Sequence, residues 1–210
     1  MLVEKTLSGF TAELASSSPA PGGGSVSALA GSISASLVAM VCNLTIGKEK
    51  YKNQEGKMKE ALEEVESLRK ELLELVDRDT DAFLDVMAAF RLPKGSDEEI
   101  KSRLEAIQNA YLYAAELPMK VCRCCLKVME ISETVICYGN PNSASDAGVS
   151  ILMAGAGAKG AALNVRINLV SISDEVKKQE MLQELDHIML TVEELEKSAL
   201  EKVENKILGL

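Results

Sequence analysis

The chain has 210 residues, and its 23 Lys and Arg against 32 Asp and Glu give a formal net charge of −9. This acidic balance disfavours a nucleic-acid partner, because binding to phosphates depends on clustered cations. Hydrophobic residues make up 47% of the chain and aromatic residues only 3%, which indicates a globular protein and favours helices over a β-sandwich or barrel.

The N-terminal sequence MLVEKTLSGF lacks the basic segment and apolar stretch of a signal peptide. Five cysteines, an odd number, are typical of free thiols in a reducing compartment. We therefore expect a cytoplasmic protein. Helical periodicity occurs nearly everywhere and no segment resembles a convincing strand, so we predict an all-α fold in which residues 1–210 form a single-domain helical bundle.

A first helix is predicted over about residues 3–16, and Pro19, Pro21 and the three glycines of PGGGS break it. From Leu14 to Gly47 no residue is charged, and a second helix is predicted to start near Ser25. It has large apolar residues on one face and small residues, four apart, on another. The small face lets a second helix backbone approach closely, so we expect this helix to be covered on all sides.

The segment Val26–Ile46 also has the length of a membrane span. Its several serines and the absence of basic residues before it favour a buried core helix instead. We therefore expect no membrane partner.

A long amphipathic helix is predicted over residues 53–91, and the sequence LPKGS ends it. Ser96 and Glu99 have the spacing of a capping box and open a helix to about Glu116. Pro118 is then expected to kink or restart the chain before a helix that runs to about residue 136.

A second charge-poor helix is predicted to start near Ala144, with Ser143 and Asp146 at capping-box spacing. It repeats the small-residue face, and we expect it to pack against the first charge-poor helix at the centre of the bundle. A last amphipathic helix is predicted over residues 174–206.

The motif PGGGS is neither a Walker loop nor a dinucleotide fingerprint, because it lacks the following Lys and a preceding strand. At a helix start, however, its glycines let a ligand come close to free N–H groups that favour anions. Three cysteines in CRCC lack a second pair of ligands, and His187 is the single histidine, so we expect no metal site. General acid–base chemistry would then fall to carboxylates, lysine, water or the backbone.

Two carboxylates stand out. Asp79 lies on the apolar stripe of the long helix, whereas Asp77, Asp81 and Asp85 fall away from it and are expected to be solvated. A carboxylate on a core-facing stripe needs hydrogen bonds or a charged partner, so Asp79 belongs either to a buried structural network or to a site. Asp146, in the first turn of the second central helix, is either a cap or a site residue.

Amide side chains gather near or within that second central helix. They are Asn140, Asn142, Asn164 and Asn168, of which the last two are four apart and share one face.

Six stretches of the chain, in this order, resemble the cyclodeaminase/cyclohydrolase family of one-carbon folate enzymes. They are PAPGGGSVSALAG, MVCNLTIGK, DRDTDAF, RLPK, GNPNSASDAGV and LNVRINL, and they span about Phe10 to Leu169. Each stretch alone is weak, but the ordered set is specific. The formiminotransferase half of the bifunctional members has no counterpart here, so the chain resembles the stand-alone form.

The resemblance implies an all-helical fold, a homodimer or higher oligomer, and action on a tetrahydrofolate adduct without any further cofactor. Cyclodeaminases convert 5-formiminotetrahydrofolate to 5,10-methenyltetrahydrofolate and ammonia, and cyclohydrolases interconvert the methenyl form with 10-formyltetrahydrofolate. A non-catalytic helical binding or assembly module that keeps the fold is the alternative.

The resemblance and the chemistry together yield the candidate site residues. Asp79 and Asp146 are the catalytic candidates, since a carboxylate stabilises the cationic amidinium of the substrate and can transfer a proton. The anionic glutamate tail of folate is expected at the helix N-terminus after PGGGS or at a lysine such as Lys94. The substrate-binding candidates are Gly22, Gly23, Gly24, Ser25, Lys94, Asn140, Asn142, Ser145, Asn164 and Asn168.

Overall fold

The computed structural model describes residues 1–209, so the predicted domain ends one residue outside the described range. The α-helices of this range are α1 (Leu7–Leu14), α2 (Gly23–Thr45), α3 (Glu55–Phe90), α4 (Asp97–Tyr138), α5 (Ala144–Leu169) and α6 (Glu175–Leu208). Short 3₁₀ helices are η1 (Leu2–Glu4), η2 (Glu49–Gln54) and η3 (Pro141–Ser143). No strand occurs within residues 1–209, and the prediction of an all-α bundle is confirmed.

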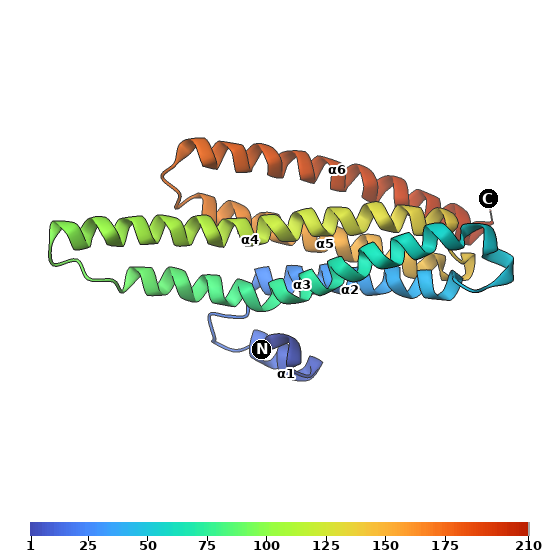
Figure 1. Ribbon diagram of the computed structural model, residues 1–210, viewed down its shortest axis with the longest axis horizontal. Coiled ribbons are helices and arrows are strands. Elements are labelled where there is room, and N and C mark those ends of the chain that lie inside the picture. The colour runs from blue at the N-terminus through green and yellow to red at the C-terminus, as the bar shows by residue number, and fades with distance from the viewer. Residues whose placement is uncertain (210) are drawn as a thin grey trace.

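The bundle is elongated, and α2 and α5 lie side by side within it, with α3, α4 and α6 around them (Figure 1). At one end of this central pair, the N–H of Asn140 donates to Thr45 Oγ1 at 2.9 Å. At the other end, Gly23 lies against Asn164. The two helices are therefore antiparallel, and their N-termini are at opposite ends of the pair. Beyond the start of α2, α3 and α4 continue as a projecting hairpin (Figure 1).

The first predicted helix is in fact two elements, η1 and α1, because the backbone is extended at Lys5 and Thr6 between them. Thr6 is the N-cap of α1, and its side chain accepts the N–H of Gly9. The capping box of Ser96 and Glu99 is present as predicted. The capping box predicted for Ser143 is absent, since Ser143 makes no side-chain cap bond. The turn of η3 precedes α5 instead, and the Asn140 side chain accepts the N–H of Asn142 at 3.1 Å to start that turn.

Pro118 does not restart the chain, because α4 continues through it. A proline has no N–H, so the carbonyl of Ala114, four residues earlier, loses its usual helical partner. The side chain of Asn168 donates to this carbonyl at 2.7 Å. An amide from α5 thus replaces the missing bond and lets α4 remain one helix.

Small residues bring α2 and α5 into backbone contact. A Cβ built on Gly157 would lie 2.9 Å from the carbonyl oxygen of Ser27 and 3.2 Å from the nitrogen of Gly31. Ala28 and Ala158, on the facing sides, are fully buried. Glycine and alanine at these positions are what allows the two helices to pack so closely.

The prediction that α2 is covered on all sides is wrong. Its small residues face the core, so its large apolar residues face outward, as do several of α5. We call this the α2/α5 outer face; it comprises Val26, Ile33, Met40 and Leu44 of α2 and Val149, Leu152, Leu163 and Ile167 of α5, which are 37% to 69% exposed. Close packing of two helices requires their small faces to meet, and this rotation leaves the large side chains in solvent.

Two stretches, Gly23–Thr45 and Pro141–Leu169, are long and apolar enough to cross a membrane by length and composition. Core helices of soluble proteins pass the same test, and 61% and 56% of the two apolar windows are buried inside the protein. Their buried sides pack against α3, α4 and α6, which is the arrangement of core helices.

Candidate functional site

A cleft of about 370 Å³ lies at the N-terminus of α2, bounded also by α3, α4 and the end of α5. This volume is within the range of small-molecule sites, which is roughly 300–1,000 Å³. We call it the Asp79 cleft. Its polar lining comes from the glycine loop, Asp79, Asn164 and Asn168. Among residues 1–209, Asp79 is the one charged side chain that lines it, so the cleft favours a cationic or neutral group.

The Asp79 carboxylate is held by the first turn of α2. The backbone N–H of Ser25 donates to Asp79 Oδ2 at 2.8 Å. The single hydroxyl proton of Ser25 is within reach of the same oxygen, at 3.0 Å, and of the Val76 carbonyl, at 2.9 Å. Burial raises the pKa of the Asp79 carboxyl above its usual value, and the two bonds from Ser25 oppose that rise. Asp79 is therefore both part of a buried network and an element of a cleft.

Gly24 is required for this approach. A Cβ at this position would lie 1.9 Å from Asp79 Oδ1, a distance that no real contact allows. A Cβ on Gly23 would lie 3.3 Å from the Asn164 side chain, whereas one on Gly22 would meet nothing within 4 Å. The three glycines therefore differ in role, and the close approach concerns an aspartate of the same chain. Because Asp79 already occupies the Ser25 N–H, this helix start has less capacity for an external anion.

The amides of Asn164 and Asn168 line the cleft from one face of α5, as their spacing predicts. Asn164 Nδ2 donates to the carbonyl of Gly160 at 2.9 Å, and Asn168 Nδ2 is bound to Ala114. Both side chains are thereby oriented before any ligand arrives.

The predicted site residues in the loop before α5 and in its first turn lie at the opposite end of the central pair. There, Asn140 Oδ1 accepts the hydroxyl of Tyr51 at 3.0 Å and shapes the loop that precedes α5. Asn142 in this loop and Ser145 just after it are exposed, and Asp146 is half-buried. At about 1.5 Å per residue, the 23 residues of α2 separate this end from Asp79 by roughly 35 Å. The expected single cluster of amides is therefore divided in two within one chain.

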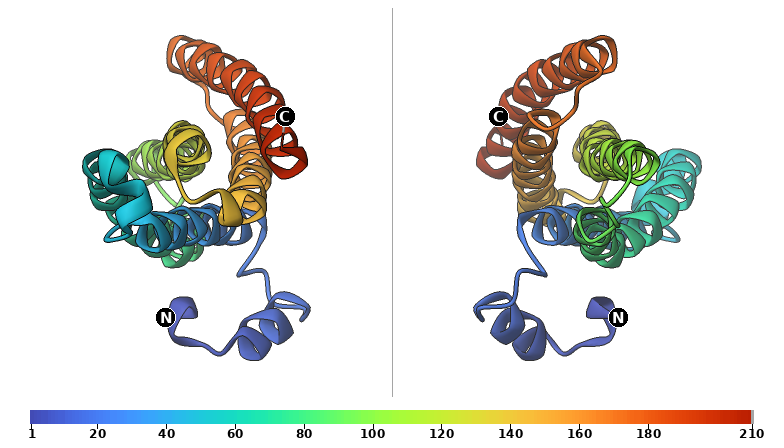
Figure 2. Two further views of the ribbon diagram at one scale, coloured as in Figure 1. Left: turned by 90° about the vertical axis from the view of Figure 1, so that its right-hand side faces the viewer. Right: turned by 90° about the vertical axis from the view of Figure 1, so that its left-hand side faces the viewer.

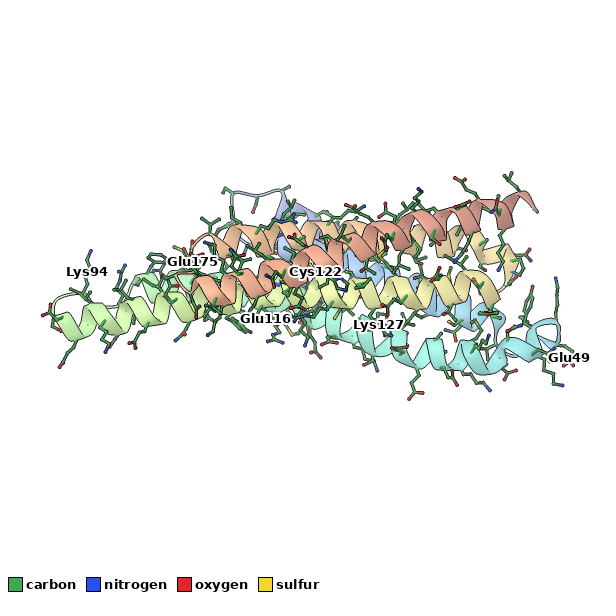
Figure 3. The ribbon with its side chains drawn as sticks, turned by 90° about the horizontal axis from the view of Figure 1, so that it is seen from above. Glu49, Lys94, Glu116, Cys122, Lys127 and Glu175 are labelled. Atoms are coloured by element: carbon green, nitrogen blue, oxygen red, sulfur yellow. The ribbon has the colours of Figure 1, made fainter. Side chains whose placement is uncertain are left out.

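Lys94 lies in the turn between α3 and α4, at the end of the molecule opposite Glu49, and does not line the Asp79 cleft (Figure 3). Asp81 and Asp85 are exposed, as predicted. Asp77 is different from the prediction, since Asp77 Oδ1 accepts the N–H of Leu2.

Sequence reasoning missed the apolar wall of the cleft. Phe83, Met87 and Phe90 of α3 and Tyr111 of α4 line it, and the rings of Phe90 and Tyr111 meet edge to face with centroids 6.2 Å apart. The positions 83, 87 and 90 have helical spacing, so they could be mistaken for a core stripe. They remain uncovered because α2 begins at Gly23 and does not extend over this part of α3.

The cysteines are free, and four of them are buried. Burial raises the pKa of the Cys122 thiol to about 12, which leaves it protonated and inert. Within residues 1–209, no group of three or more His, Cys, Asp or Glu is arranged to hold a metal ion. His187 is exposed on α6. In this chain, Asp79 is therefore the carboxylate placed for acid–base work in the cleft.

Comparison with known proteins gives relatives of two kinds. A methenyltetrahydrofolate cyclohydrolase of Methylorubrum extorquens is 42% identical over 207 residues, which cover 99% of this chain and 100% of the relative. A formimidoyltransferase-cyclodeaminase of Gallus gallus is 35% identical over 191 residues, which cover 90% of this chain but 35% of the relative. The chain therefore spans about a third of that bifunctional protein.

The fold has a counterpart of known structure. The crystal structure of formiminotetrahydrofolate cyclodeaminase from Thermotoga maritima matches with a TM-score of 0.88 and 31% identity, covering 99% of this chain and 100% of its own. The family model described as Formiminotransferase-cyclodeaminase matches residues 6–187. These matches confirm the resemblance found in the sequence motifs, and the chain belongs to the formiminotransferase-cyclodeaminase family.

Proposed function

We propose that this protein is a folate one-carbon enzyme that acts at the bridge between N5 and N10 of a tetrahydrofolate adduct. As a methenyltetrahydrofolate cyclohydrolase it would add water to the methenyl carbon and open the ring to the 10-formyl form. As a formiminotetrahydrofolate cyclodeaminase it would let N10 attack the formimino carbon and release ammonia. Both reactions pass through a tetrahedral carbon, so one site can serve either.

The observation that carries this proposal is the Asp79 carboxylate in a cleft that contains no other charged side chain. The methenyl bridge and the protonated formimino group are both cationic amidinium groups, and a carboxylate facing them stabilises the positive charge. Burial also raises its pKa in the direction of the operating pH, which favours proton transfer because a general acid or base works best when its pKa is close to that pH. The aromatic wall of Phe90 and Tyr111 offers an apolar surface to a flat ring.

We place the cyclohydrolase reaction first, because the relative so named is 42% identical and matches end to end. The cyclodeaminase reaction is the second candidate, supported by the fold match of 31% identity. Assays of the purified protein with methenyltetrahydrofolate and with 5-formiminotetrahydrofolate separate the two. Folate binding without turnover of either compound would instead support a non-catalytic module.

We further propose a homodimer through the α2/α5 outer face. Its eight side chains leave several hundred Å² of apolar surface in solvent, which approaches the roughly 800 Å² that each partner of a stable interface buries. The charged neighbours on α5 turn toward α6, where Lys159 pairs with Glu196 at 2.8 Å and Arg166 with Asp186 at 3.4 Å. An uncharged face can meet its own copy without opposing like charges.

We propose that the two-fold axis lies in the plane of this face and at right angles to α2, which is the orientation that brings opposite ends of the two subunits together. Since the Asp79 cleft and the Asn140–Asp146 loop lie at opposite ends of α2, the axis places the loop of one subunit beside the cleft of the other. We propose that each site combines Asp79 of one subunit with Asp146 of its partner. This arrangement would reunite the candidate residues that one chain keeps apart.

The remaining expectations are part of the same proposal. A cytoplasmic enzyme with no membrane or nucleic-acid partner accords with the net charge of −9 and with a dimer that covers the apolar outer face. We propose no cofactor beyond the tetrahydrofolate that carries the one-carbon unit.

Gly24→Ala should lower kcat/KM at least about tenfold, because the added methyl group displaces the carboxylate that has to face the reacting carbon. Gly56→Ala is the matched control, since the same methyl group meets nothing within 4 Å there and Gly56 does not line the cleft. Steady-state kinetics on both variants, with circular dichroism to verify folding, provide the comparison. Equal activity in the two variants would contradict the role given to the close approach.

The acidic limb of the pH–rate profile should lie above the ordinary aspartate range of about 4, because burial raises the pKa of Asp79. Activity should fall as the pH drops through that pKa, since protonation removes the charge that stabilises the cation. Profiles of kcat/KM for the wild type and for Asp81→Asn should share this limb. If the limb of the wild type lay at the usual value, Asp79 would not be the titrating group.

A further inference from the structure

The first 22 residues form an arm outside the helical bundle. The arm consists of η1, α1 and the loop that leads to α2, and it lies along one side of the bundle (Figure 2). Pro19, Ala20 and Gly22, at its end, line the Asp79 cleft. The position of the arm therefore determines one wall of the proposed substrate site.

Both apolar and polar contacts hold the arm to the bundle. Phe10 of α1 is only 7% exposed and belongs to the hydrophobic core. Near the N-terminus, the N–H of Leu2 donates to Asp77 Oδ1 on α3, while Asp77 Oδ2 is buried and has no hydrogen-bond partner among residues 1–209. A half-buried carboxylate with a single neutral donor is costly, and an apolar residue would avoid that cost. The benefit that offsets this cost is the bond to Leu2, which attaches the arm to α3.

A continuous chain of polar contacts links this attachment to the cleft. Lys5, just after η1, forms an ion pair with Glu13 near the end of α1. The hydroxyl of Ser16 donates to the carbonyl of Glu13 at 2.7 Å and accepts the N–H of Ser18 at 3.1 Å. The hydroxyl of Ser18 in turn donates to the carbonyl of Ala20 at 2.6 Å. The arm is thus one connected unit whose two ends are the Asp77 bond and the cleft wall.

We infer that Asp77 is a positioning residue: by holding Leu2 it fixes the arm, and through the arm it sets the Pro19–Gly22 wall of the cleft. Asp77 does not itself line the cleft, so it acts on substrate affinity and not on the chemical step. This inference rests on the proposed function, because the wall matters only if the cleft binds the folate substrate.

Asp77→Ala should raise KM for the folate substrate about tenfold while kcat stays within about twofold, because Asp79 and Ser25 are left in place. Asp77→Asn should restore KM to within about threefold of the wild type, since the amide oxygen can accept the same N–H. Asp81→Ala, at an exposed position one turn further along α3, is the matched control and should change neither constant. A merely structural role would lower the melting temperature or the active fraction without raising KM.

Hydrogen exchange provides a readout that needs no substrate. In Asp77→Ala the amides of residues 2–20 should exchange faster than in the wild type, with α2 to α6 unchanged. Leu2→Pro removes the donor, together with the Leu2 side chain that packs on the core, and should speed exchange of the same amides at least as much, even if Asp77→Ala proves unstable. Faster exchange with unchanged KM would overturn the positioning role, and unchanged exchange would overturn the attachment. A wild type that turns over neither folate would refute the proposed function alone.

Discussion

Asp79→Asn is expected to lower turnover at least about tenfold, because general acid–base assistance is typically worth about 100- to 10,000-fold and the charge that faces the substrate cation is also lost. The substitution keeps the size of the side chain and an oxygen that can accept the N–H of Ser25. The cleft and the start of α2 should therefore keep their shape. Steady-state kinetics with both folate substrates provide the measurement.

The stability of the same variant should be maintained or increased at pH 7. The pKa of Asp79 is raised in the folded state, so between its unfolded and folded pKa values the folded protein binds more protons than the unfolded one. Stability therefore falls as the pH rises through that window, and Asn removes this loss. Below the unfolded pKa, about 4, protonated Asp79 resembles Asn, and thermal melts of the two proteins should converge there.

Asp81→Asn is the control for both measurements, because Asp81 is exposed on the same helix. It should leave turnover and the melting temperature near the wild-type values. Near-normal turnover in Asp79→Asn would remove Asp79 from the mechanism and leave Asp146 as the better catalytic candidate.

Two inactive variants are expected to restore each other if the site is shared between subunits. A heterodimer of Asp79→Asn with Asp146→Asn would contain one site with both aspartates intact and one site with neither, so it should show about half of the wild-type turnover. Co-expression with two different affinity tags and purification on both isolates this heterodimer. Each homodimer of a single variant should be at least about tenfold slower than the wild type.

The opposite pairing tests the same geometry with a reversed outcome. A heterodimer of the wild type with the double variant Asp79→Asn/Asp146→Asn should be nearly inactive, since each shared site would lack one aspartate. If both aspartates acted within one chain, this pairing would instead retain about half of the activity and the first pairing would have little. A monomer on sizing columns, or an active Asp146→Asn homodimer, would also refute the shared site.

Apart from the N-terminal helix and the expected break at Pro118, the helices and their approximate ends were predictable from the sequence, because the signals for them are local. Ser96 with Glu99 caps α4, and apolar residues at helical spacing mark the buried stripe of α3. The unusual position of Asp79 was visible for the same reason, since a carboxylate on such a stripe needs partners wherever it folds. Those partners, Ser25 and the start of α2, were not identifiable from the sequence.

What only the tertiary structure decided is which distant groups meet. The Asn168 side chain donates to the Ala114 carbonyl, which Pro118 leaves without its helical partner. Neither the asparagine nor the proline reveals this bond in the sequence. The periodic pattern predicts a solvated Asp77, but the N–H of Leu2 in the returning N-terminal arm donates to it. The rotation of α2, which turns its large side chains outward, follows from the close contact at Gly31 and Gly157. Local sequence determines helices through bonds within a few residues, whereas the pairing of faces and ends depends on how whole helices pack.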